Sequence, residues 1–293
     1  IPEYNLRFYK QNFPGRQCIV FADISSERST LDSMIKTCGI IGFFSLVVFL
    51  GISILLSKWA VRPIEEAWNG QRKFLDDASH ELKTPLEVIL TNSELACSDD
   101  YSAEEKRRFV ENIHTMSSHM KVLVEQMLEL SRTDRPVSKP VEQIVDLSGI
   151  VHHIVLPLEA MLFEKGHPLE CEISPDILVK GNEQQLSQVV EILLDNAGKY
   201  ASENGGIQVF LNRQGNRHCV LTVRNEGQEI PEEELKNLFK RFYRMDSSRT
   251  RDGSFGLGLS IAENIVNSHR GKIRAESKDG WNSFYVSIPA ADK

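Results

Sequence analysis

A stretch of 21 uncharged residues, TCGIIGFFSLVVFLGISILLS at positions 37–57, restricts the fold of this chain more than any other feature. No Asp, Glu, Lys or Arg lies between Lys36 and Lys58. About 20 apolar residues are enough for a helix to cross the hydrocarbon core of a bilayer. A buried core helix would normally keep a polar face, and none is visible here. The stretch therefore predicts a transmembrane helix.

The basic residues around this stretch indicate its orientation. Lys36 precedes it, whereas four basic residues follow it: Lys58, Arg62, Arg72 and Lys73. This weak positive-inside bias places the C-terminal side in the cytoplasm. Residues 1–36 are then expected to form the membrane-proximal end of an extracytoplasmic segment. Because the sequence begins at Ile1 rather than Met, we expect a fragment, or a chain that lacks something upstream.

The composition excludes several classes of protein. The chain has 293 residues, of which 41% are hydrophobic and 26% charged, so it can build globular cores and is neither disordered nor fibrous. Its net charge of −7 and its scattered basic residues argue against direct binding of nucleic acid. The five cysteines are far apart and lack C-x-x-C spacing, which predicts reduced thiols.

Positions 74–134 have the pattern of a helical hairpin that breaks at positions 98–100. Apolar residues recur at spacings of four and three along the second helix, as in a coiled coil or four-helix bundle. We call these residues the apolar seam: Phe109, Ile113, Met116, Met120, Leu123, Met127 and Leu130. The first helix keeps the same register, although it is less apolar. Since two helices cannot bury both of these faces alone, the pattern predicts a homodimer with a four-helix bundle.

The first helix of this hairpin carries His80 in an unusual setting. Pro85 interrupts the helical hydrogen bonding five residues later, which a purely structural helix would avoid. A lone exposed histidine on a helix is usually a solvated surface residue. However, positions 74–89, FLDDASHELKTPLEVI, resemble without a gap the phospho-accepting box of bacterial two-component sensor histidine kinases.

This resemblance implies a catalytic role for three residues. A neutral imidazole is a good nucleophile near pH 7, so His80 is expected to accept the phosphoryl group. Glu81 is placed to take up the other ring proton of His80. Thr84 matches the family's threonine that positions water for dephosphorylation of the partner regulator, although it also fits an exposed helical hydroxyl.

Past positions 135–140, the pattern changes from heptads to mixed helices and strands. Helices are expected near positions 147–165 and 182–200, and strands at positions 207–213, 219–223 and 284–288. Helices grouped against one face of a mixed sheet form a two-layer α/β sandwich.

Two motifs in this half resemble the N and G1 boxes of the ATPases that include histidine kinases, gyrase and Hsp90. The N box supplies Asn196, a hard oxygen ligand for Mg²⁺, together with Lys199 and Tyr200. In the G1 box, Asn225 replaces the usual Asp that seats adenine, and Gly227 keeps the first glycine. The Asn225 amide oxygen can still accept a hydrogen bond from the adenine amino group, so we expect a working but weaker site.

A glycine-rich turn resembles the G2 box of the same family. It contributes Gly253, Ser254, Gly256 and Gly258 at the start of a helix, where backbone can approach phosphates closely. Positions 245–252 are expected to form a lid, in which Arg249 either contacts a phosphate or is a solvated surface residue. Ile192 stands where gyrase-like hydrolases place a catalytic Glu, which disfavours plain ATP hydrolysis.

The boxes occur once each and in family order, so the resemblance implies a membrane-bound sensor histidine kinase. It also implies ATP and Mg²⁺ as cofactors and a response regulator as partner. It implies a bacterial cytoplasmic membrane, with the catalytic part in the cytoplasm. The expected organisation is an outer segment (1–36), a transmembrane helix (37–57), a juxtamembrane linker (58–73), a dimerisation and phosphotransfer hairpin (74–134), a linker (135–140) and an ATP-binding domain (141–293).

Two alternatives stay open from the sequence. Because Asn225 and Glu229 depart from the usual box, the chain could act mainly as a phosphatase of its regulator. It could instead be a membrane scaffold without catalytic activity, although a scaffold needs neither His80 nor the glycines of the G2 box.

Overall fold

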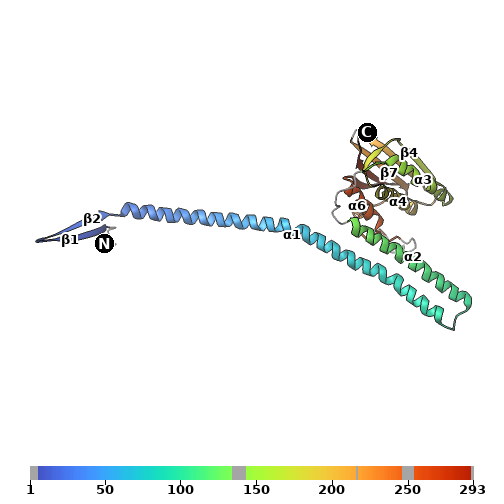
Figure 1. The fold of residues 1–293 in the computed structure, drawn as a ribbon, viewed down its shortest axis with the longest axis horizontal. Coiled ribbons are helices and arrows are strands. Elements are labelled where there is room, and N and C mark those ends of the chain that lie inside the picture. The colour runs from blue at the N-terminus through green and yellow to red at the C-terminus, as the bar shows by residue number, and fades with distance from the viewer. Residues whose placement is uncertain (1–5, 134–142, 216, 246–253, 292–293) are drawn as a thin grey trace. The chain divides into compact units, whose positions relative to one another are not determined.

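The computed structural model describes residues 6–133, 143–215, 217–245 and 254–291. The chain divides into two compact units, Ile1–Lys73 and Phe74–Lys293, and helix α1 (Ser25–Cys97) contributes to both. The order of helices and strands along the chain can be followed in Figure 1.

The first unit contains a β-hairpin and the apolar part of α1. Strands β1 (Leu6–Phe13) and β2 (Arg16–Asp23) pair antiparallel. The segment Ser25–Arg62 is long enough to cross a membrane, and its most apolar 18 residues have a mean hydropathy of 2.6 and are not buried inside the protein. It contains the predicted transmembrane stretch. The helix Leu147–Glu164 also passes this test of length and composition, but 39% of it is buried in the second unit, as in a core helix.

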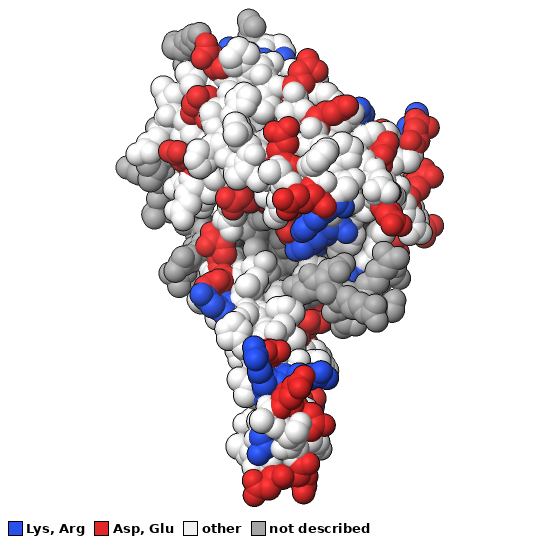
Figure 2. Space-filling model, turned by 90° about the vertical axis from the view of Figure 1, so that its right-hand side faces the viewer, with Lys and Arg blue, Asp and Glu red and all other residues white. Residues whose placement is uncertain are grey.

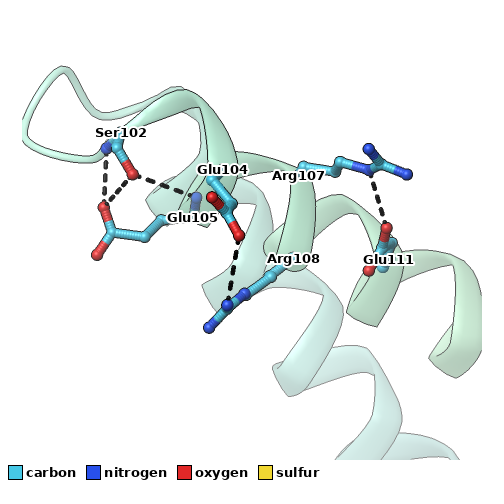
Figure 3. A network of polar contacts seen from close by, with 6 residues as sticks. All are labelled: Ser102, Glu104, Glu105, Arg107, Arg108 and Glu111. Atoms are coloured by element: carbon cyan, nitrogen blue, oxygen red, sulfur yellow. Dashed lines mark hydrogen bonds and ion pairs between the residues drawn. The ribbon is translucent and has the colours of Figure 1, made fainter.

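The second unit begins with a helical hairpin, formed by the C-terminal part of α1 and by α2 (Ala103–Thr133). Ser102 and Glu105 form a capping box at the start of α2, in which the Ser102 hydroxyl accepts from the Glu105 backbone N–H at 3.3 Å (Figure 3). The Glu105 carboxylate in turn accepts from the Ser102 backbone N–H at 2.8 Å, and the two hydrogen bonds from Ser102 lower the pKa of Glu105. This cap was not predicted from the sequence.

Two asparagines join the helices of the hairpin. Asn92 is buried, and its amide oxygen accepts a hydrogen bond from Nδ2 of Asn112 at 3.2 Å. Because these two residues lie opposite each other, they set the register of the antiparallel pair.

The remainder of the second unit is an α/β domain. Its five-stranded sheet has the order β4-β6-β7-β9-β8, in which only the β4–β6 pair is parallel. The strands are β4 (Leu169–Ile173), β6 (Ile207–Gln214), β7 (His218–Glu226), β8 (Lys272–Lys278) and β9 (Trp281–Pro289). A two-stranded sheet pairs β3 (Gln143–Asp146) with β5 (Leu178–Gly181). The predicted strands correspond to β6, β7 and β9, whereas β3, β4, β5 and β8 were not predicted.

Three of the four helices that the structure describes in this domain share a hydrophobic core with buried residues of the larger sheet, and the short fourth helix buries none of its residues. The four helices are α3 (Leu147–Glu164), α4 (Glu183–Tyr200), the short α5 (Glu232–Leu235) and α6 (Gly258–Ser268). Alternate residues of β6 and β7, such as Val209, Leu221 and Val223, are buried, and the residues between them are partly exposed. This period of two is the pattern of a sheet with one face against a core.

One side of the molecule can be inspected for charge in Figure 2. Asp and Glu side chains are spread over the visible face, whereas Lys and Arg form only small groups. This distribution agrees with the net charge of −7. The five cysteines are free thiols, and burial raises the pKa of Cys219 to about 11, which keeps this thiol protonated and unreactive near neutral pH.

Glu263 on α6 provides a test of the packing of the domain. Burial raises the pKa of its carboxyl group above the ordinary 4.5. The folded state therefore holds this proton more tightly than the unfolded chain, and the ionised carboxylate costs stability as the pH rises above 4.5. We expect Glu263→Gln to raise the melting temperature at pH 7 by about 1–4 °C.

The pH dependence of this gain separates the charge from other effects of the substitution. Below the ordinary pKa, both states carry the proton, so thermal unfolding at pH 4 should show almost no difference between Glu263→Gln and the parent. A gain that is the same at both pH values would contradict the interpretation.

Candidate functional site

A cavity of about 400 Å³ lies in the second unit, where α4, β7 and the start of α6 meet. Seven of the predicted binding residues line it: Asn196, Lys199, Tyr200, Asn225, Ser254, Gly256 and Gly258. They come from three motifs that are far apart in the sequence. The fold therefore brings the N, G1 and G2 boxes to one place.

The last turn of α4 contributes the N-box residues. The helix begins at the Asn182 cap, whose Oδ1 accepts from the Gln185 backbone N–H at 3.0 Å. Asn196, Lys199 and Tyr200 are spaced at i, i+3 and i+4, which places them on one face of the helix. Nζ of Lys199 lies 2.5 Å from Oδ2 of Asp195, so the lysine is a cation held at the cavity wall.

Asn225 lies at the end of β7 and is 1% exposed. Its Nδ2 donates to the backbone carbonyls of Tyr200 at 3.1 Å and Glu226 at 3.3 Å. Both partners are acceptors, so they hold the amide with its nitrogen toward these two carbonyls. Its Oδ1 is buried and has no hydrogen-bond partner among the described residues. A buried acceptor without a partner is the group that an amino donor of a ligand would satisfy.

Gly227 does not line the cavity, but it lies close to the donor and the acceptor of a hydrogen bond that orients Asn225. A Cβ atom at this position would lie 2.8 Å from the Tyr200 carbonyl oxygen and 3.0 Å from Nδ2 of Asn225. A larger residue would thus push against the group that orients Asn225, which explains why the motif carries glycine here.

The G2 turn contributes a further part of the cavity lining. Gly256 has a φ of +69°, and a Cβ atom there would lie 2.6 Å from the Tyr243 carbonyl oxygen. Gly258 begins α6, and Oγ of Ser254 is buried with no hydrogen-bond partner among the described residues. A helix N-terminus beside an unpaired hydroxyl is suited to anionic phosphate oxygens. Arg249 and Gly253, which were assigned to the same site, lie outside the described residues.

Two further lining residues, Val122 and Gln126, come from α2 of the hairpin. Neither was predicted from the sequence, because both occupy ordinary positions between residues of the apolar seam. Oε1 of Gln126 is buried and lacks a hydrogen-bond partner among the described residues, as do Asn225 Oδ1 and Ser254 Oγ. All three unpaired atoms belong to residues that line the same cavity.

The three predicted phosphotransfer residues lie on α1 and are exposed. Oγ1 of Thr84 donates to the His80 carbonyl oxygen at 3.5 Å, so the two residues share one face of the helix. His80, Glu81 and Thr84 are absent from the cavity lining among the described residues. The structure thus separates a binding cavity from an accessible histidine within one compact unit.

The donor set near Asn196 suits Mg²⁺. Among the residues that the structure describes, no three His, Cys, Asp or Glu side chains form a metal cluster. Mg²⁺ is usually held by one or two protein oxygens together with substrate phosphates and water. The Asn196 amide oxygen at the cavity wall provides such a ligand, so the residues present fit this ion.

The fold and the cavity define a protein that combines an ATPase-like α/β domain with a histidine-bearing helical hairpin, and comparisons with known proteins agree. Residues 70–136 match the family described as His Kinase A (phospho-acceptor) domain. Residues 181–292 match the family described as Histidine kinase-, DNA gyrase B-, and HSP90-like ATPase.

Curated relatives extend this match. The sensor protein DltS of Streptococcus agalactiae serotype V is 33% identical over 246 residues, which cover 84% of this chain and 61% of DltS. The sensor histidine kinase YkoH of Bacillus subtilis is 36% identical over 219 residues, covering 74% of this chain and 47% of YkoH. By its domains and these relatives, the chain belongs to the two-component sensor histidine kinases. It spans only about half to three-fifths of the length of these relatives.

Solved structures show the same fold. The histidine kinase AdeS of Acinetobacter baumannii superposes with a TM-score of 0.54 at 20% identity, covering 73% of this chain and 98% of AdeS. The histidine kinase ThkA, solved in complex with the response regulator protein TrrA, superposes with a TM-score of 0.60 at 18% identity, covering 99% of this chain and 80% of ThkA.

Proposed function

We propose that this chain is the membrane-anchored kinase part of a sensor histidine kinase. The cavity binds ATP, the γ-phosphoryl group moves to His80, and an Asp of a response regulator then receives it. The observation that carries this proposal is the meeting of Asn196, Asn225 and the G2 glycines at one cavity, in the same compact unit as His80.

In the proposed transfer, a nitrogen of the neutral His80 ring attacks the γ-phosphorus of ATP. A nitrogen–phosphorus bond forms, the bond between the γ-phosphorus and the bridging oxygen breaks, and ADP leaves. Glu81 takes up the proton on the other ring nitrogen as the ring gains positive charge. Lys199 and the start of α6 stabilise the phosphate charge, and a bound Mg²⁺ ion held by Asn196 would neutralise part of it.

The hairpin is proposed to dimerise. Leu86 and Leu90 on α1 and Leu128 on α2 are 47%, 55% and 54% exposed in the single chain. Apolar residues in these positions would be buried in a four-helix bundle with a second copy. The proposed domain arrangement therefore joins a dimeric bundle to a two-layer α/β sandwich.

The remaining parts of the proposal concern location and partners. The apolar segment Ser25–Arg62 would cross the cytoplasmic membrane of a bacterium, with the second unit in the cytoplasm. The ThkA structure contains a response regulator, which supports a response regulator as the partner of this chain. Thr84 is proposed to assist dephosphorylation of that regulator.

The direct test uses the 293-residue chain in lipid nanodiscs with γ-labelled ATP and Mg²⁺. We expect the chain to acquire a phosphate label that is stable in base and labile in acid, because a phosphorus–nitrogen bond has these properties. A chain that binds ATP and remains unlabelled would overturn the kinase proposal and favour a phosphatase. A chain that neither binds ATP nor becomes labelled would favour a scaffold.

Asn225 gives a second test of the same cavity. Restoring the family's usual Asp would place a carboxylate oxygen against the carbonyls of Tyr200 and Glu226, both of which are acceptors. We expect Asn225→Asp to lower the free energy of unfolding by about 1–3 kcal/mol and not to increase ATP affinity. Thermal unfolding and ATP titration measure the two effects. Tighter ATP binding with unchanged stability would show that the amide has the opposite orientation.

A further inference from the structure

Gln126 occupies an unusual place for a hairpin residue. It lies one helical turn after Val122 on α2, and both side chains line the cavity of the α/β domain. Its Oε1 is buried and has no hydrogen-bond partner among the described residues. Because a buried acceptor without a partner costs free energy, such a group calls for a ligand that satisfies it.

Apolar packing holds the part of α2 around Gln126 against the α/β domain. Leu123 and Leu130 are completely buried in the hydrophobic core that they share with α4 and α6, and Met127 packs against the same core. On α1, Phe74 packs against Phe242 of the domain with ring centroids 5.6 Å apart. Gln126 therefore reaches the cavity from a firmly packed helix.

The chemistry of ATP limits what Gln126 could contact there. Phosphate oxygens accept hydrogen bonds, so they cannot satisfy a buried amide oxygen. The donors of ATP are the adenine amino group and the ribose hydroxyls. Asn225 already offers one buried acceptor from β7, and Gln126 offers a second from α2 of the hairpin.

We propose that Gln126 is a nucleoside-binding residue that the phosphotransfer hairpin contributes to the ATP cavity, where its amide oxygen accepts a hydrogen bond from a donor of the nucleoside. This inference rests on the proposed binding of ATP. It means that the nucleotide touches both the domain and the hairpin, so nucleotide binding and docking of α2 strengthen each other by the same factor.

The register of the hairpin places Gln126 and His80 at almost the same level along the helix axes. His80 lies 12 residues before Asn92, and Val124 lies 12 residues after Asn112, the hydrogen-bond partner of Asn92. In an antiparallel pair, His80 and Val124 are thus level, and Gln126 is about 3 Å further along the axis. The proposed nucleoside contact therefore lies at almost the same position along the hairpin axis as His80.

The test measures nucleotide affinity of the 293-residue chain in nanodiscs by titration calorimetry with ATP and with analogues that each lack one donor. The analogues are 2′-deoxy-ATP, 3′-deoxy-ATP and N6,N6-dimethyl-ATP. Gln126→Met keeps the length of the side chain and removes the amide. We expect it to raise the Kd for ATP about fivefold to tenfold. Lys121→Met, on the same helix and highly exposed, is the matched control and should change the Kd less than about twofold.

The analogues decide the outcome. If the contact exists, Gln126→Met should not raise the Kd of the analogue that lacks the contacted donor. The analogue that behaves in this way identifies the donor. Gln126→Glu keeps an acceptor of the same length and should still discriminate between ATP and that analogue. No penalty, or an equal penalty with ATP and every analogue, would overturn the inference. A parent chain that does not bind ATP would overturn the proposed function itself, and this inference with it.

Discussion

His80→Gln is expected to reduce acid-labile phosphorylation of the chain by ATP at least about 100-fold. Glutamine preserves the size and polarity of the side chain, but its amide nitrogen is not a nucleophile and cannot accept the phosphoryl group. His80 is exposed on α1, so the substitution removes no core contact and should leave folding intact. The measurement is incorporation of γ-labelled phosphate in nanodiscs, with ATP affinity determined on the same samples.

The control for this experiment is His114→Gln, which makes the same substitution at an exposed position of α2. It should leave both labelling and ATP affinity unchanged. If His80→Gln retains the acid-labile label while His114→Gln loses it, the phospho-acceptor is misassigned. Loss of ATP binding in His80→Gln would instead show that the substitution acts through folding.

Gly256→Ala should have a comparably large effect on the binding of ATP. At a φ of +69°, an alanine is strained by about 1–2 kcal/mol. Its Cβ atom would also lie 2.6 Å from the Tyr243 carbonyl oxygen and 2.9 Å from the Phe242 carbonyl carbon, so the G2 turn must move. Because this turn forms a wall of the cavity, we expect the Kd for ATP to rise about tenfold or more.

Gly215→Ala separates backbone strain from damage to the cavity. Gly215 has a φ of +63°, which imposes a similar strain, but a Cβ atom there would have nothing within 4 Å. This variant should lose thermal stability and keep the parent's affinity for ATP. Equal loss of affinity in both glycine variants would show that the effect of Gly256→Ala comes from general destabilisation.

The sequence motifs located the cavity well because each box is short and continuous. Asn196, Lys199 and Tyr200 lie within one helical turn, so their common face follows from helical spacing alone. Gly256 and Gly258 were likewise assigned from a local turn, and both line the cavity. Parts of β6, β7 and β9 were predicted from strand-like alternation in the sequence, and fully and partly buried residues alternate along the same parts in the structure.

Other elements of the domain escaped prediction for physical reasons. No residue of β4 or β8 is fully buried, since both strands lie at the edges of the sheet, and each strand carries only two or three apolar residues. β3 and β5 are four residues long and form a separate two-stranded sheet, and Val179 of β5 makes one further bridge to Ala290. Such short or half-exposed strands form because they pair with neighbouring strands, and the local sequence pattern alone does not predict them.

The apolar seam illustrates the same limit. Its spacing predicted a helix with one buried stripe, and a second copy of the chain was the expected partner. In the structure, Leu123 and Leu130 are completely buried within a single chain, in the core of the α/β domain. A periodic apolar pattern shows that a face will be buried, but it does not identify what buries it.

Local patterns thus determined the apolar stretch in Ser25–Arg62, the hairpin with His80 and the boxes that form the cavity, because each depends on residues close together in the chain. Only the tertiary structure decided that Tyr200 orients the Asn225 amide and that Gln126 reaches the cavity. Both results depend on contacts between residues 25 or more positions apart, and no local pattern of side chains encodes such contacts.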